Sequence, residues 1–205
     1  MENQSKTYPT TVYAEMTPNP ATMKFVANRL LIQHDAVAEF FTKEEAKGYS
    51  QMAEQLFQFP FVKSVFITTN FVTVTKNDSI SWDFVTMELR EFVSDYLRTH
   101  EWAVTEIPPV KEHEKPTNTI QLKDPESLTE IDKKIMGILD EYVRPAVEND
   151  GGAIHYKSFD NGKVSVILRG SCSGCPSSQA TLKQGIETLM KQMLPEVTEV
   201  VAEEV

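Results

Sequence analysis

The run AIHYKSFDNGKVSVILRGSCSGCPSS, residues 153–178, joins a strand pattern, a turn signal and the only two cysteines of the chain. Residues 153–159 and 163–169 are rich in β-branched and apolar side chains, and Asp160-Asn161-Gly162 separates them. Asn-Gly between two such runs is a strong hairpin signal, because both residues tolerate a positive φ. The sequence therefore predicts a β-hairpin that leads directly to Cys172 and Cys175.

A helical pattern precedes this hairpin. Ser127 and Glu130 fit a capping box, and Pro145 is expected to end or bend the helix that they start. Its apolar face consists of Ile131, Ile135, Ile138, Leu139 and Tyr142. Asp150-Gly151-Gly152 then predicts a turn that uses backbone angles open to glycine.

A second helical pattern follows the cysteines. Its apolar residues, with the two methionines as core filler, are Leu182, Ile186, Leu189, Met190 and Met193. Pro195 stops this helix, and residues 197–202 are predicted to form a last strand. The predicted order in this part of the chain is therefore helix, strand, strand, helix, strand.

The N-terminal half shows a second mixed pattern. Residues 62–67 and 71–76 predict a hairpin, and the apolar spacing from Trp82 to Tyr96 predicts an amphipathic helix with Ser81 as its N-cap. Residues 50–59 predict a shorter helix, and residues 23–32 an extended strand. The chain is thus expected to be an α+β protein with two small mixed domains.

A stretch rich in proline and charge separates the two patterns. It contains Pro108, Pro109, Pro116 and Pro125 and has no sustained apolar period. Such composition favours a solvated linker over a long loop inside one domain. We therefore predict an N-terminal domain over residues 8–104, a linker over 105–126 and a C-terminal domain over 127–205.

Composition limits the classes of partner. The chain has 205 residues, of which 40% are hydrophobic, and a net charge of −10, without a patch rich in lysine and arginine. These features argue against nucleic-acid binding, and no apolar run is long enough to cross a bilayer. Residues 1–16 lack the pattern of a signal or transit peptide, and two cysteines are too few for a disulfide scaffold. We therefore expect a cytoplasmic protein with no nucleic-acid or membrane partner.

The two cysteines provide half of the ligands that a thiolate metal site usually needs. Ser173 and Gly174 let the loop wind tightly, and Pro176 fits the first turn of a helix whose N-terminus favours thiolates. An iron–sulfur cluster usually takes four thiolates, whereas Cys172 and Cys175 provide two. A symmetric dimer that contributes one pair from each chain is the simplest completion. A cluster held in this way is exposed and releasable.

The spacing alone leaves other chemistry open. A Cys-x-x-Cys pair between a strand and a helix is also found in thiol–disulfide oxidoreductases. Zinc shared across a dimer and two unreactive thiols are further alternatives. Against the oxidoreductase, no tryptophan precedes Cys172 directly, and only residues 176–205 follow Cys175.

The surrounding residues resemble the C-terminal domain of NifU-like (Nfu-type) iron–sulfur cluster proteins. The shared markers are Arg144-Pro145, Asp150-Gly151-Gly152, Gly170, Cys172-x-x-Cys175-Pro176-Ser177-Ser178, Thr181-Leu182-Lys183, Gly185-Ile186-Glu187 and Pro195-Glu196-Val197. The N-terminal half resembles the domain that accompanies it in many members. That match is carried by Thr17-Pro18-Asn19-Pro20, Met23-Lys24-Phe25, residues 62–66, residues 71–76 and Trp82.

This resemblance implies a carrier or scaffold rather than an enzyme. It implies a [4Fe–4S] cluster between two subunits, with Cys172 and Cys175 of each as ligands, and delivery to apo-proteins after loading by upstream assembly proteins. Ala153 departs from the acidic residue that the family often has after the double glycine, which is expected to affect only the turn. The N-terminal domain is expected to recognise clients or to modulate the site.

Overall fold

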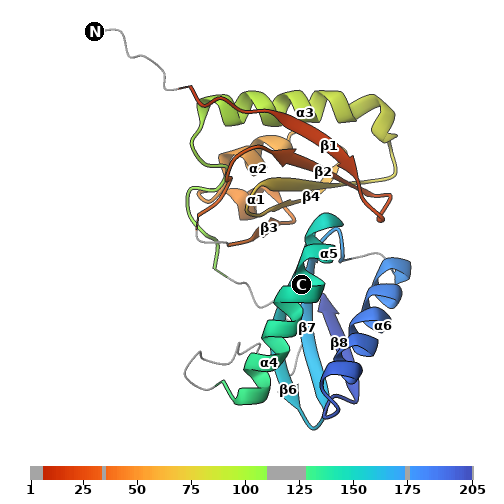
Figure 1. The fold of residues 1–205 in the computed structure, drawn as a ribbon. Helices are drawn as coiled ribbons and strands as arrows, with labels where there is room; N and C mark the ends of the chain where they lie inside the picture. The colour runs from red at the N-terminus through yellow and green to blue at the C-terminus, as the bar shows by residue number, and fades with distance from the viewer. Residues whose placement is uncertain (1–6, 34–35, 110–127, 174–175, 205) are drawn as a thin grey trace. The chain divides into compact units, whose positions relative to one another are not determined.

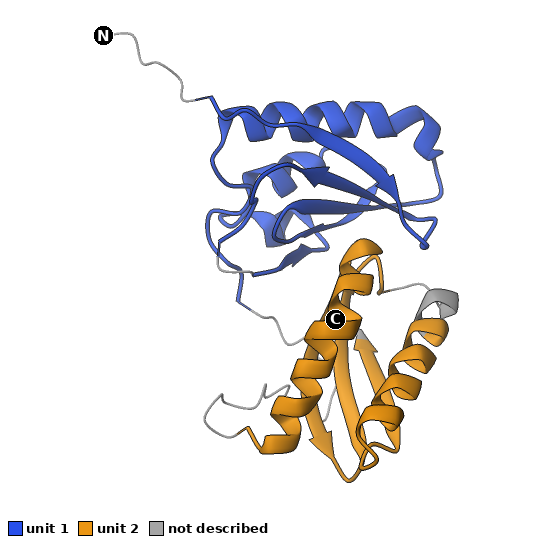
Figure 2. Ribbon diagram, viewed as in Figure 1, with its two compact units in different colours: residues 1–109 blue, residues 110–205 orange. Residues whose placement is uncertain are grey.

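The structure, a computed structural model, describes residues 7–33, 36–109, 128–173 and 176–204. The chain divides into two compact units, Met1–Pro109 and Val110–Val205, each with its own hydrophobic core (Figures 1 and 2). Both units mix helices with a sheet, which confirms the α+β class. Residues 110–127, which include most of the predicted linker, lie outside the described part, so the predicted domain limits stay predictions.

Unit 1 is built on a five-stranded sheet with the order β1-β2-β5-β4-β3. Its strands are β1 (Val12–Met16), β2 (Thr22–Ala27), β3 (Ala38–Phe40), β4 (Val62–Ile67) and β5 (Phe71–Lys76). Its helices are α1 (Lys43–Ala46), α2 (Gln51–Leu56) and α3 (Trp82–Thr99), and α3 runs beside β1 in Figure 1. All four recorded pairings are antiparallel.

Local patterns predicted most of unit 1. The hairpin of β4 and β5 and the helix α3 lie where expected, and Ser50 caps α2 by accepting from Ala53 N at 3.1 Å. The predicted strand over residues 23–32 is too long, because β2 ends at Ala27. Ser81 is the N-cap of α3, yet its side chain donates to Asp83 Oδ2 and does not bond the helix backbone.

Unit 2 follows the predicted order around a three-stranded sheet, β6-β7-β8. A helical segment comes first: α4 (Glu130–Ile138), the π-helix η2 (Leu139–Val143) and α5 (Arg144–Asn149). The antiparallel pair β6 (Gly152–Asp160) and β7 (Lys163–Gly170) follows, then α6 (Pro176–Met193) and β8 (Glu199–Glu204), which lies parallel to β7. Asn161 and Gly162 adopt φ of 48° and 83°, as the Asn-Gly turn requires.

The start of α4 differs from the predicted capping box. Thr129 is the N-cap, and its Oγ1 accepts from Asp132 N while Asp132 Oδ2 accepts from Thr129 N at 2.8 Å. The predicted partner of Glu130, Ser127, lies outside the described residues. Asp132 is fully buried and also accepts a hydrogen bond from Tyr156 OH, so this cap ties the helix to β6.

The helical segment does not end at Pro145. A π-helical turn before Pro145 changes which side chains face the core. Arg144 N donates to Leu139 O, five residues back, which is the π-helical bond. The extra residue rotates the following side chains, so Tyr142 is 50% exposed and Val143 is buried in the core. Tyr142 was predicted to lie on the apolar face. In α6, Met193 was likewise predicted to be core filler and is exposed, whereas Met190 is fully buried.

Candidate cysteine site

Cys172 lies where the central strand of unit 2 ends. Residue pairing places Gly152, the first residue of β6, opposite Gly170, the last residue of β7. Two residues later, the side chain of Cys172 packs into the edge of the unit 2 core and is only 5% exposed. The hairpin thus fixes the place of the thiol through its register.

Gly152 leaves the space that the sulfur fills. A Cβ atom at this position would lie 2.7 Å from Cys172 Sγ and 2.6 Å from Arg169 O. Both distances are shorter than side-chain packing permits, so any side chain here displaces the thiol or the β7 backbone. The double glycine was predicted as a turn. Gly151 does adopt a positive φ of 82°, but the role of Gly152 is steric.

Short hydrogen bonds connect the cysteine loop to that turn. Ser171 N donates to Gly151 O at 3.2 Å, and Ser173 N donates to Gly170 O at 3.1 Å. Ser173 Oγ donates to the same carbonyl at 2.8 Å. Gly170 itself has a φ of 66°, which a side chain would strain. The chain therefore turns sharply at Gly170 and delivers Cys172 next to Gly152.

The protonation of Cys172 differs from the sequence-based expectation. Burial, with a smaller contribution from the Asp150 carboxylate, raises the pKa of the Cys172 thiol to about 12. The α6 N-terminus was expected to favour the thiolate, but the apolar surroundings of the sulfur dominate in the chain alone. Cys172 is thus a neutral thiol in this conformation.

The structure places one of the two predicted ligands. Cys175 lies outside the described residues, and so does Gly174 between the cysteines. Within the described part of the chain, no three His, Cys, Asp or Glu side chains gather closely enough to hold a metal ion. The Cys172 sulfur is the soft donor atom that the structure describes at this site, and thiolate sulfur is a ligand type that thiophilic metals prefer. Gly152 is the site residue whose role the sequence did not reveal, because its contact with Cys172 depends on strand register.

Both halves of the chain match models of known protein families. Residues 12–100 match the family model "Scaffold protein Nfu/NifU N terminal", and residues 135–201 match "NifU-like domain". Together with the two-unit α+β fold and the cysteine loop, these matches define a scaffold protein of the Nfu/NifU type. The chain belongs to that family, as its motifs predicted.

The relatives that it matches are longer proteins. "NFU1 iron-sulfur cluster scaffold homolog, mitochondrial" of Homo sapiens is 34% identical over 91% of this chain and 69% of its own length. "NifU-like protein 4, mitochondrial" of Arabidopsis thaliana is 32% identical over 91% of this chain and 63% of its own length. A solution structure of a NifU-like protein from Saccharomyces cerevisiae is 22% identical, with a TM-score of 0.41, over 52% of this chain and 91% of that chain.

These relatives correct the expected location. Both curated relatives are named mitochondrial proteins, so the prediction of a cytoplasmic protein is wrong. That prediction rested on residues 1–16 and on the small number of cysteines, and the number of cysteines does not separate one reducing compartment from another. As for membranes, none of the described helices combines the length and the apolar character that a bilayer span requires.

Proposed function

We propose that this chain is an iron–sulfur cluster carrier that binds a [4Fe–4S] cluster between two subunits and delivers it to apo-proteins. The observation that carries the proposal is the position of Cys172, held on a glycine-bordered loop at the end of β7 in a chain of the Nfu/NifU family. Relatives with both domains are named cluster scaffolds. The cluster is cargo here, so the protein needs no acid–base pair.

Four thiolates complete such a cluster, and two chains provide them. Cys172 and Cys175 of each subunit are the proposed ligands, and the dimer forms through the C-terminal units. Backbone N–H groups at the start of α6, which begins at Pro176, offset the negative charge of the cargo. Because Cys172 Sγ lies against the core beside Gly152, loading requires its side chain to move outward.

Delivery proceeds by thiolate exchange. A client thiol forms a bond to iron while the bond between that iron and Cys172 or Cys175 breaks. The proton of the client thiol passes to the departing cysteine, and neither sulfur nor iron changes its oxidation state in the exchange. Repeating this step moves the cluster to the client. The N-terminal unit is proposed to recognise clients or to modulate the site.

Two alternatives are kept as outcomes of the test. A thiol–disulfide oxidoreductase needs a cysteine that a substrate disulfide can reach, and Cys172 is buried. A zinc dimer would use the same four thiolates. The carrier is preferred because relatives from Homo sapiens and Drosophila willistoni that match over both units are named iron–sulfur cluster scaffold homologs.

Anaerobic reconstitution with iron and sulfide tests the proposal. Visible absorption, iron and sulfide analysis and sizing by light scattering should give one brown [4Fe–4S] cluster per dimer, and an apo client should then gain it. A colourless monomer that reduces disulfides would indicate the oxidoreductase. A colourless dimer that contains zinc would indicate the zinc dimer.

Ligand variants complete the test. Cys172→Ser and Cys175→Ser should each abolish cluster binding while the circular dichroism spectrum stays that of the parent chain. Ser173→Ala is the matched control on the same loop, because it removes only a hydroxyl bonded to Gly170 O. A cluster retained in either cysteine variant would contradict the ligand assignment.

A further inference from the structure

Among the strands that the structure describes, the edge strand β1 pairs on one side only, with β2. Asn28 N donates to Thr11 O at 3.2 Å and Thr11 N donates to Asn28 Oδ1 at 3.0 Å, so the backbone of Thr11 faces β2. Because this direction alternates along a strand, the N–H and C=O groups of Val12, Ala14 and Met16 point away from β2. Val12 is buried, with 8% of its surface exposed, so this side of β1 is open to pairing with another extended chain from Ala14 onward.

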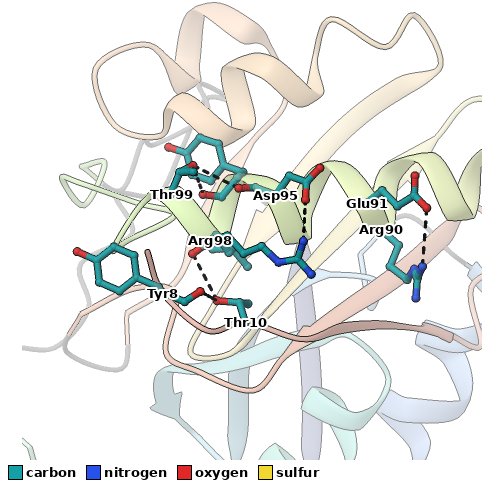
Figure 3. A network of polar contacts seen from close by, with 9 residues as sticks. Tyr8, Thr10, Arg90, Glu91, Asp95, Arg98 and Thr99 are labelled. Carbon is teal, nitrogen blue, oxygen red and sulfur yellow. Dashed lines mark hydrogen bonds and ion pairs between the residues drawn. The ribbon is translucent and has the colours of Figure 1, made fainter. Parts of the chain in front are cut away.

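Helix α3 flanks that open side and forms a groove with it. The groove has a volume of about 450 Å³ and lies between residues 10–12 and the α3 side chains of Arg90, Glu91, Ser94, Asp95 and Arg98. Figure 3 shows this flank of α3 above the strand. One end is closed, because Tyr8 N donates to Arg98 O at 2.8 Å. An edge strand beside a helix is the arrangement used when peptides bind by β-strand addition.

Beyond the groove, the same side of α3 continues to exposed apolar side chains. Phe84, Met87, Glu91, Ser94 and Arg98 recur at spacings of three and four, so they follow one side of α3. Phe84 is 78% exposed and Met87 is 58% exposed.

Met16, which is 86% exposed, ends β1 at the same end of unit 1. Trp82 Nε1 donates to Pro20 O at 3.0 Å and thereby holds the start of α3 beside the turn after β1. Exposed apolar side chains at the start of α3 and at the end of β1 are typical of an interaction surface, and two of the three are adaptable methionines.

The groove is also lined by an arginine with unused hydrogen-bonding capacity. Arg98 is paired with Asp95 at 3.2 Å, whereas the one ion pair recorded for Arg90 among the described residues is with its neighbour Glu91, at 4.0 Å. Arg90 Nε is buried and has no hydrogen-bond partner among the described residues. The Arg90 side chain as a whole is 37% exposed, so a carboxylate of a bound segment can pair with the accessible nitrogens of its guanidinium group.

We propose that this groove binds an extended segment of a partner protein by β-strand addition. The backbone of the segment pairs with Ala14 and Met16, an apolar side chain packs against Met87, and a carboxylate of the segment binds Arg90. The groove belongs to unit 1 alone, so this inference does not depend on the cluster cargo.

A phage-displayed library of random short peptides, panned on the immobilised full chain, tests this proposal. Enriched peptides should pair an apolar residue with Asp or Glu, and their synthetic forms should shift the amide NMR signals of residues 12–16 and 84–98. Ala14→Pro removes an outward N–H without touching the ladder to β2, and should weaken binding at least about tenfold. Ala14→Ser, which keeps the N–H, is the matched control.

Arg90→Glu provides a second, independent variant if Ala14→Pro does not fold. It should weaken binding of acidic peptides and favour counterparts in which lysine replaces the acidic residue. The proposal is overturned if no peptide is enriched, if the enriched peptides are basic, or if binding survives both Ala14→Pro and Arg90→Glu. Cys172→Ser should bind peptides as the parent chain does, which separates this test from that of the cluster proposal.

Discussion

Gly152 has no room for a side chain, and this gives the sharpest prediction at the residue scale. A Cβ atom there would meet Arg169 O at 2.6 Å and Cys172 Sγ at 2.7 Å. The carbonyl belongs to the central strand and cannot move freely. Gly152→Ala should therefore lower the free energy of unfolding of unit 2 by about 1–3 kcal/mol. Urea denaturation followed by circular dichroism measures this change.

Gly185 provides the matched control. It lies in the middle of α6, and an added Cβ would meet nothing within 4 Å. Gly185→Ala should raise the free energy of unfolding by about 0.5–1 kcal/mol, because alanine has the higher helix propensity. Equal effects of the two substitutions would show that the contact between Gly152 and Cys172 is absent in solution.

His155 should make the stability depend on pH. Burial lowers the pKa of His155 from 6.5 to about 4, and the positive charges of Arg169 and Arg144 add to this effect. The negative charge of Asp140 opposes it. Between these values the unfolded chain binds a proton that the folded chain does not. The free energy of unfolding should therefore be unaffected by His155 above pH 6.5 and fall by about 2–3 kcal/mol as the pH drops to 4.

The measurement separates His155 from other groups that titrate in acid. Urea denaturation of the parent chain and of His155→Gln at several pH values should show a smaller decline for the variant. NMR titration of the imidazole signals should place one histidine well below the ordinary range. If His155 titrates near 6.5, this source of pH dependence does not exist.

At the scale of elements, the π-helix η2 decides which side chain enters the core. The i+5 bond from Arg144 N to Leu139 O turns Val143 inward and Tyr142 outward. Val143→Ala should lower the free energy of unfolding by about 1–3 kcal/mol, because it leaves a cavity. Tyr142→Ala should change it by less than about 0.5 kcal/mol. In a continuous α-helix Tyr142 would face the core instead, and Tyr142→Ala would be the more destabilising substitution. Urea denaturation of the two variants therefore decides between the π-helix and a continuous α-helix.

The same segment shows what the sequence can and cannot predict. Short-range patterns located the β4–β5 hairpin, the Asn161-Gly162 turn and α6, because the responsible residues are neighbours in the chain. The π-helical bond cannot be predicted from neighbouring residues in this way. The spacing of apolar residues up to Leu139 is that of an ordinary α-helix. The edge strands β1 and β3 were missed because they are only five and three residues long.

The cysteine site follows the same division between local and distant information. The Cys-x-x-Cys spacing and the glycines beside it are visible in the sequence, and they predicted Cys172 and Cys175 as ligands. The burial of Cys172 and its contact with Gly152 depend on the pairing of Gly152 with Gly170. The Asn161-Gly162 turn alone would pair Gly152 with Ser171. The register shift between Tyr156 and Ser158 moves the partner to Gly170, and because the sequence does not reveal this shift, the steric role of Gly152 needed the structure.

For the whole molecule, separate cores predict separate unfolding of the two units. No buried residue is shared between the core around Leu89 and the core around Leu168 among the described residues. Both tryptophans of the chain, Trp82 and Trp102, belong to unit 1, so their fluorescence reports on that unit alone. Circular dichroism at far-ultraviolet wavelengths reports on both units.

One variant in each unit tests this independence. Leu89→Ala should lower the urea midpoint of the tryptophan transition, since loss of a fully buried leucine costs about 2–5 kcal/mol. Tyr156→Phe removes the hydroxyl bonded to the buried Asp132 and should cost about 1–3 kcal/mol in unit 2. It should shift the circular dichroism transition and leave the fluorescence transition unchanged. If each variant shifts both transitions equally, the units unfold as one cooperative body, and the unfolding free energy belongs to the whole chain rather than to either core.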